Sequence, residues 1–287
     1  MGQRYDWIAE GSGETMSRLR GSLSSILNNE KKDSTYYRIA HYLAENAYRL
    51  KRISVQDISN NCYVSKSTVS RFCRDIGYED YYELNHDMYQ LVETRYNKFQ
   101  RYNQDSFEER QASYYKDLLS GIEYARKYIR QEDVEYLASM LFRYRNIGVL
   151  GSLHSHAVSE YFQHDLGLFS KVISAPLLPE NQQDFIRCSD RDTLIIVVSC
   201  RGNYFNQLLG KIKVTEGCCP CCVLITDNPK MKNSNPYEKV IYIPCSENYA
   251  QQPRNIGYFL NQVVLEYAYR DQKNKENEDD DPLAQPN

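Results

Sequence analysis

Residues 53–74 constrain the fold more than any other stretch of this chain. Their sequence, ISVQDISNNCYVSKSTVSRFCR, predicts a short helix, a tight polar turn and a second helix. In the second helix Val64, Val69 and Phe72 recur at helical spacing, so one side of it is apolar. Ser65 precedes this helix and can accept hydrogen bonds from the free amides of its first turn. The pattern is typical of a helix-turn-helix.

The polar side of the second helix carries hydroxyls and cations, which suit the DNA major groove. Ser and Thr reach phosphates and base edges, and Arg can hold guanine with two hydrogen bonds. An ordinary amphipathic helix pair with a solvated polar side gives the same periodicity, so that alternative stays open. For Arg71 a second role, tying the helix to its neighbours, also stays open. The residues predicted to face the groove are Ser65, Lys66, Ser67, Thr68, Ser70, Arg71 and Arg74.

The turn between the two helices departs from the usual motif. Ser59, Tyr63 and Val69 fall where the motif usually has Ala, Gly and Val. Ser59 is small enough to let the helices approach each other. Tyr63 replaces the Gly, so it predicts either a distorted turn or a non-glycine residue in the left-handed conformation.

The residues that follow complete a longer pattern, in which Gly77 stops the second helix. Residues 54–84 resemble the N-terminal domain of the RpiR family of bacterial transcription regulators, with the pattern S-I-x-E-L-A…V-S-x-x-T-V-x-R-F-C-R-x-L-G-F-x-G-F-x-E-L. The matching residues are Ser54, Val64, Ser65, Thr68, Val69, Arg71, Phe72, Cys73, Arg74, Gly77, Tyr78, Tyr81 and Leu84. The resemblance implies a DNA operator as partner and no enzymatic activity. It also implies a homodimer or homotetramer, since paired half-sites need two-fold symmetry.

The distribution of charge agrees with DNA binding. The net charge of the 287 residues is only −3, but residues 36–78 hold seven cations against three anions, and residues 271–287 hold six anions against two cations. A local positive face beside an acidic tail is compatible with a nucleic-acid partner. No secretory signal is evident, and no apolar stretch reaches the roughly 18 residues of a membrane helix. With nine cysteines, these features predict reduced thiols and a cytoplasmic protein without a membrane partner.

The strand and helix pattern predicts two domains. Apolar runs at 147–151, 192–199, 223–226 and 240–243 are typical of buried strands, and helical stretches separate the first three. This favours a doubly wound, mostly parallel sheet. We therefore expect an all-α helix-turn-helix domain at 1–102, a linker at 103–110, an α/β domain at 111–270 and a disordered acidic tail at 271–287.

Two loops of the α/β domain are candidates for ligand binding, because ligands bind at the carboxyl ends of parallel strands. They read GSLHSH at 151–156 and SCRGNY at 199–204. The pair resembles the SIS domain, which binds phosphosugars, with G-x-G-x-S after one strand and S-x-S-G-x-T after the next. Hydroxyls beside the amides of a helix start favour an anion. The candidate ligand-binding residues are Ser152, His154, Ser155, Ser199, Arg201, Asn203 and Tyr204.

Three departures from the SIS pattern leave several hypotheses open. Leu153 replaces the second Gly and would crowd a phosphate, and Tyr204 replaces the Thr. Arg201 replaces the second Ser and could either grip phosphate as a fork or pair with an acid. The first hypothesis is a regulator of sugar metabolism genes controlled by a phosphosugar, and the second is a regulator with a degenerate SIS domain. The third, a phosphosugar isomerase, needs a catalytic base, for which the candidates are His154, His156 and Glu180.

The sequence CCPCC at 218–222 suggests a metal or redox site. Zinc sites usually combine two such pairs from separate segments or add His, and the five His residues lie elsewhere in the sequence. The cluster precedes an expected strand, so we interpret it as structural thiols and keep a metal site as the alternative. We expect no metal, no cofactor and no catalytic residue.

Overall fold

The computed structural model describes residues 22–47, 53–86, 88, 100, 102–152, 154–200, 204, 219–231, 237–245 and 253–279. The chain divides into two compact units, Met1–Asn103 and Gln104–Asn287. Within the described ranges, no helix is both long enough and apolar enough to span a membrane. Each unit has its own apolar core.

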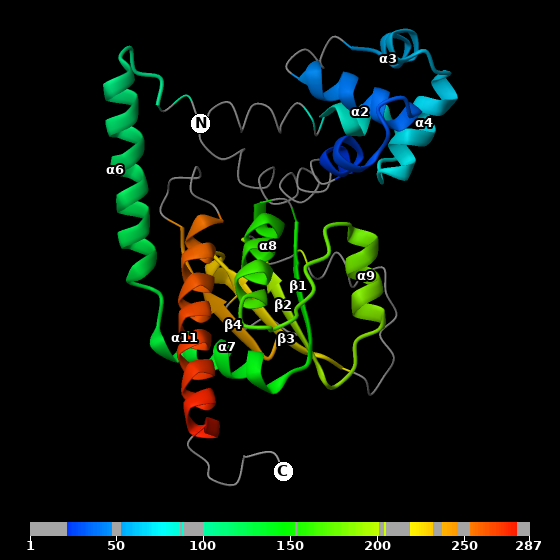
Figure 1. Ribbon diagram of the computed structural model, residues 1–287. Helices are drawn as coiled ribbons and strands as arrows, with labels where there is room; N and C mark the ends of the chain where they lie inside the picture. The colour runs from blue at the N-terminus through cyan, green and yellow to red at the C-terminus, as the bar shows by residue number, and fades with distance from the viewer. Residues whose placement is uncertain are drawn as a thin grey trace. The chain divides into compact units, whose positions relative to one another are not determined.

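The first unit is helical, and its helices follow from local start signals. Helix α2 spans Thr35–Glu45, α3 spans Val55–Cys62 and α4 spans Lys66–Asp75 (Figure 1). Ser34, Ser54 and Ser65 cap the three helices, each accepting a hydrogen bond from an amide in the first turn. These caps satisfy amides that have no partner inside the helix. The buried side chains of the three helices then form one core, which includes Ile39, Leu43, Ile58, Val69 and Phe72.

Helix α4 ends at Asp75, and the predicted stop residue Gly77 follows two positions later with a positive φ of 91°. The amide of Tyr78 donates to the Cys73 carbonyl at 2.8 Å, and the amide of Gly77 donates to the Arg74 carbonyl at 2.9 Å. This pair of bonds is a Schellman motif, whose left-handed position favours glycine. Tyr78 and Cys73 are both buried, so the motif also anchors the chain leaving α4 in the core.

The second unit is built around a parallel sheet. Its described strands are β1 (Asn146–Gly151), β2 (Thr193–Val198), β3 (Cys221–Thr226) and β4 (Lys239–Tyr242), in the order β1-β2-β3-β4. All three strand pairs are parallel. The α/β fold is therefore the one expected from the apolar runs. The other elements are α6 (Phe107–Arg126), α7 (Gln131–Arg143), α8 (His154–Gly167), α9 (Pro179–Arg187), a 3₁₀ turn (Pro229–Met231) and α11 (Arg254–Asp279).

Helices cover both faces of this sheet (Figure 1). Side chains of α7, α8 and α11 pack with Val149 and Ile196 on one face, whereas Ile186 of α9 packs with Leu150 and Ile195 on the other. The path of the chain after β1 explains why helices lie on both faces. Ser174 forms an isolated parallel bridge with Gly148, on the side of β1 that does not pair with β2. The chain thus crosses from β1 first to that side and then back to β2. Right-handed crossovers in opposite directions place α8 and α9 on opposite faces.

The domain boundaries differ from the expected ones at two places. Helix α6 begins at Phe107, inside the expected linker at 103–110, and α11 continues to Asp279, inside the expected tail at 271–287. The helix persists past Arg270 because side-chain pairs four residues apart support it, such as Lys275–Asp271 at 2.6 Å. Residues 280–287 lie outside the described residues.

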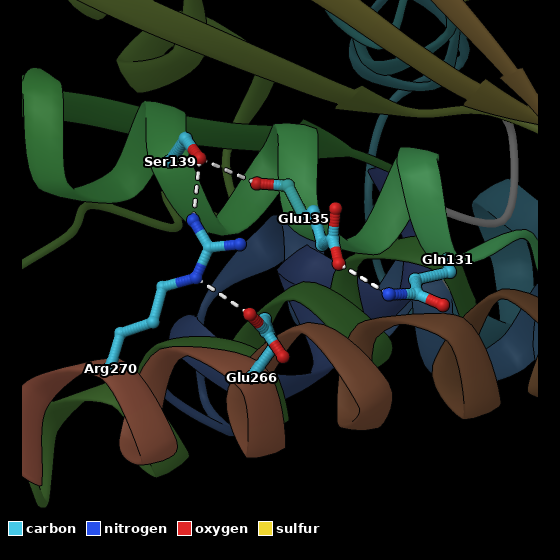
Figure 2. Close-up of polar contacts among 5 residues, drawn as sticks. All are labelled: Gln131, Glu135, Ser139, Glu266 and Arg270. Carbon is cyan, nitrogen blue, oxygen red and sulfur yellow. Dashed lines mark hydrogen bonds and ion pairs between the residues drawn. The ribbon is translucent and has the colours of Figure 1, made fainter. Parts of the chain in front are cut away.

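A polar network fastens α11 to α7 (Figure 2). Arg270 donates from Nη1 to Ser139 Oγ and from Nε to Glu266 Oε1, both at 2.6 Å. The Ser139 hydroxyl donates in turn to the Glu135 carbonyl at 2.7 Å, and the Glu135 carboxylate accepts from Gln131 at 2.6 Å. The network therefore joins residues more than 100 positions apart in sequence through one guanidinium.

Candidate nucleic-acid interface and ligand-binding loops

The start of α4 concentrates hydroxyl groups at one point. The Ser65 oxygen accepts from the Thr68 amide at 3.1 Å and lies 2.7 Å from Ser67 Oγ and 2.8 Å from Thr68 Oγ1. Ser70, one turn further on, donates its hydroxyl hydrogen to the Lys66 carbonyl at 3.1 Å. Its oxygen keeps the ability to accept a hydrogen bond from a base or a sugar. Hydroxyls of this kind fit both phosphate and base-edge contacts.

The cations of α4 lie on its solvent side. Lys66 begins the helix, Arg74 lies in its last turn, and Arg71 lies between them, and all three side chains are exposed. Val69 and Phe72, on the opposite side, are 1% and 0% exposed. Of the seven residues predicted to face the groove, Thr68 is half-buried and the other six are exposed. That these residues contact DNA remains a prediction.

A left-handed residue forms the turn between α3 and α4, as Tyr63 has φ 54° and ψ 50°. This is one of the two alternatives expected where Tyr replaces Gly. The Ser59 carbonyl accepts from the Val64 amide at 3.0 Å, and the Ser59 hydroxyl donates to the Val64 carbonyl. Ser59 therefore fixes the turn, while the Tyr63 ring is 86% exposed and contributes little packing.

Helix α4 is positioned from its inner side by α2. The ring of Tyr36 packs edge-on against Phe72 with centroids 5.3 Å apart, and the Tyr36 hydroxyl donates to the Asp75 carboxylate. Burial and this hydrogen bond raise the pKa of Tyr36 to about 12, so the phenol keeps its proton at neutral pH. The contact fixes the end of the helix and leaves its polar side open.

In the second unit the two candidate loops leave neighbouring strands. Gly151, the last residue of β1, is paired with Val198, the last residue of β2. Gly151 is closely packed, because a Cβ there would lie 3.1 Å from both the Cβ of Ser155 and the carbonyl oxygen of Val198. Ser155 and Ser199 are 8% and 6% exposed. The loops therefore meet at the carboxyl edge of the sheet, where the direction of the crossovers reverses.

The predicted ligand residues differ in how the structure uses them. Ser155 is hydrogen-bonded to the Cys200 thiol, whose pKa is raised by burial. The Ser155 amide donates to the Ser152 carbonyl at 3.0 Å, so this helix-start amide is already used inside the helix. Ser152 is half-buried and His154 is exposed. Arg201 and Asn203 lie outside the described residues.

Gln182 of α9, which the sequence analysis did not single out, joins these loops. It is 0% exposed, and its amide nitrogen donates to the carbonyls of Gly151 and Pro176, both at 2.8 Å. Its oxygen accepts from the Tyr204 hydroxyl at 3.1 Å. Burial raises the pKa of Tyr204, so the phenol stays a donor. The hydroxyl of a predicted ligand residue is therefore bonded to a buried amide of the protein.

His156, in the first turn of α8, is a second buried polar group beside the loops. It is 8% exposed, and its Nδ1 has no hydrogen-bond partner among the described residues. Burial lowers its pKa, while the Glu160 carboxylate acts in the opposite direction. A neutral imidazole with an unused nitrogen can bind a ligand hydroxyl.

The comparison with known families bears on the first unit. Residues 16–93 match the model described as the helix-turn-helix domain of the rpiR family. The chain carries an rpiR-family DNA-binding domain. The matched residues include α2, α3 and α4, with the capped start of α4 and its glycine stop. The match indicates a helix-turn-helix domain of the kind found in rpiR-family transcription regulators, and it concerns these residues alone.

Comparisons of the whole chain give weaker results. No curated protein matches it. NanR of Vibrio vulnificus, solved with ManNAc-6P, is 17% identical with a TM-score of 0.47, covering 91% of this chain and 94% of NanR. The sugar isomerase domain of an RpiR transcription factor from Sphaerobacter thermophilus is 14% identical with a TM-score of 0.41, covering 56% and 89%. Protein MJ1247 of Methanococcus jannaschii is 13% identical with a TM-score of 0.41, covering 55% and 90%. These similarities assign neither ligand nor activity.

Part of this site was within reach of the sequence. His156 was named only as a candidate base, and nothing local indicates that its ring is buried. Gln182 gives no signal, because its partners Gly151 and Tyr204 are 31 and 22 positions away. Among the described residues, no group of three or more His, Cys, Asp or Glu is arranged to hold a metal.

Proposed function

We propose that this protein is a cytoplasmic regulator of sugar metabolism genes that binds a DNA operator through α4. The exposed hydroxyls and cations on a helix fixed from behind by α2 carry this proposal. One such helix reads few base pairs, so the protein binds paired half-sites as a homodimer or homotetramer. Light scattering at micromolar concentration tests the assembly, and a single 33.7 kDa species would contradict it.

We further propose that a phosphosugar bound at the loops after β1 and β2 controls DNA binding. Three features support this. The loops lie at the carboxyl ends of β1 and β2, where the direction of the crossover connections reverses. The residues Ser155 and Ser199 are buried there, and Nδ1 of His156 has no hydrogen-bond partner among the described residues. In this arrangement the hydroxyls and the Arg201 guanidinium hold the phosphate, and His156 binds a sugar hydroxyl. The ligand acts on DNA binding only through different affinities for two arrangements of the assembly.

Calorimetry tests the ligand site directly. The panel contains glucosamine 6-phosphate, N-acetylmuramic acid 6-phosphate, fructose 6-phosphate, ribose 5-phosphate and ManNAc-6P. A charge-assisted bond contributes about 1.5–3 kcal/mol, so Arg201→Ala weakens binding about tenfold or more, and Ser155→Ala weakens it less. Arg187→Ala, on the exposed side of α9, is the matched control and leaves binding unchanged. If no panel compound binds below millimolar concentration, the sensor proposal fails.

A regulator with a degenerate, non-sensing domain is the second candidate, and one contact favours it. The Tyr204 hydroxyl is bonded to Gln182, where the SIS pattern has a smaller Thr. The variant Tyr204→Thr separates the two candidates, because it removes the ring and leaves the Gln182 oxygen without that donor. Binding by the variant but not by the natural protein supports the degenerate domain. Binding by both, with similar affinity, supports the sensor.

A further inference from the structure

A cavity lies at the amino-terminal ends of the strands, whereas the ligand loops follow their carboxyl-terminal ends. Its volume is about 460 Å³, and it is lined by Arg191, before β2, and by Cys219–Cys222 at the start of β3. Arg143, from the last turn of α7, and Glu238, before β4, complete much of the wall. Pockets of this size hold small organic ligands. The proposed sugar site uses none of these residues.

The thiols of the cavity differ in accessibility. Cys219 is exposed, Cys221 is half-buried and Cys222 is buried on the face of the sheet that carries Leu224. Burial raises the pKa of Cys221, although its hydrogen bond with Tyr144 opposes the change, and burial raises the pKa of Cys222 to about 12. Because the thiolate is the attacking species in thiol chemistry, Cys221 and Cys222 are poor nucleophiles. Cys219 is the accessible thiol of the three.

The charges of the cavity favour an anion. Two guanidinium groups, of Arg143 and Arg191, line it together with one carboxylate, of Glu238. Cys219 adds an exposed thiol beside this cationic pocket, which is large enough for a small peptide.

We propose that this cavity is a site of S-thiolation, in which Cys219 reacts with a small anionic disulfide of the glutathione disulfide class. The Cys219 thiolate attacks one sulfur of the disulfide, the disulfide bond breaks, and a new bond joins Cys219 to that sulfur. The departing thiolate takes up the proton that Cys219 lost. Cys219 is thereby oxidised to a mixed disulfide and one small thiol is released. The bound half keeps its carboxylates near Arg143 and Arg191.

Mass spectrometry with peptide mapping tests this on the full chain, using glutathione disulfide and the cationic disulfide cystamine as probes. Cys188, exposed at the end of α9 and outside the cavity, is the internal control. We expect the rate at Cys219 relative to Cys188 to be about tenfold higher with glutathione disulfide than with cystamine, because opposite charges attract and like charges repel. The double variant Arg143→Glu/Arg191→Glu removes this preference, and Cys219→Ser abolishes the cavity adduct.

Three results would overturn the proposal. The first is an equal preference at Cys219 and Cys188, which would make Cys219 an ordinary surface thiol. The second is continued labelling of residues 218–222 in Cys219→Ser. The third is an internal disulfide without any retained small thiol. Circular dichroism of each variant shows whether the fold is intact, and all three substituted positions are exposed.

Discussion

Reversing the charge of Lys66 and Arg74 together is the sharpest perturbation of the proposed DNA interface. Both side chains are exposed, and they lie at opposite ends of α4. Eight residues of α-helix span about 12 Å, which is close to the width of the major groove, roughly 12 Å. The two cations are therefore placed to reach the phosphates on either side of a groove that holds the helix.

The expected effect follows from counterion release. Each phosphate contact contributes about 0.9 to the slope of log affinity against log salt concentration. Losing two contacts lowers the magnitude of this slope by about 1.8. When salt is raised from 50 to 200 mM, the affinity of the variant therefore falls by a factor about 12 times smaller than that of the natural protein. The variant Lys66→Glu/Arg74→Glu also places two carboxylates beside phosphates, so operator binding is abolished at physiological salt.

Fluorescence anisotropy with an operator selected from random DNA by the natural protein measures this effect. The matched control is Lys116→Glu/Lys127→Glu, which makes the same change of net charge at exposed positions on and just after α6 in the second unit. The control keeps most of the affinity, and circular dichroism confirms that both variants fold. Retained binding by the α4 variant, with an unchanged salt slope, would refute the assignment of α4 as the recognition helix.

Three further predictions concern stability. Tyr63→Gly relieves a left-handed non-glycine residue whose ring is 86% exposed and should raise the free energy of unfolding by about 1 kcal/mol in urea titrations; a decrease would show that the ring is needed for the turn. Arg270→Ala removes the bonds joining α11 to α7 and should lower the free energy of unfolding by about 1 kcal/mol, whereas the exposed Lys275→Ala should have little effect. His156 has a lowered pKa in the folded state, so the unfolded state binds its proton more tightly and stability is lost as pH falls below about 6.5. His156→Gln should flatten the pH dependence of the unfolding midpoint between pH 5 and 7, and an unchanged profile would assign that dependence to other groups.

The sequence predicted the first unit well because its signals are local. The Ser65 cap bonds an amide three residues away, and the Gly77 motif closes within five residues. The burial of Val69 and Phe72 follows from helical spacing alone. Even the left-handed Tyr63 was one of two alternatives left open by the pattern. Interactions this short in sequence form in much the same way in any fold that contains the helices.

The strands of the second unit were also evident, since buried parallel strands are continuous apolar runs. The ends of the helices in this unit were harder to predict from the sequence. The polar residues after Arg270 predicted a disordered tail, yet α11 continues to Asp279. Pairs four residues apart, such as Lys275–Asp271, support this last part of the helix, while the Arg270–Ser139 contact holds the preceding part against α7. Residues 271–279 themselves give no sign of the contact with α7.

The sites of the second unit depend on tertiary structure for the same reason. The sequence placed Ser155 and Tyr204 in candidate loops, but it gave no sign that Gln182 binds both the end of β1 and the Tyr204 hydroxyl. Likewise the cysteine motif can be recognised in the sequence, but its position beside two arginines cannot. Arg143 comes from α7 and Arg191 from the turn before β2. Local hydrogen bonds and periodicity are set by the order of residues. Contacts between residues tens of positions apart form only after the crossover connections have placed the helices on one face of the sheet or the other.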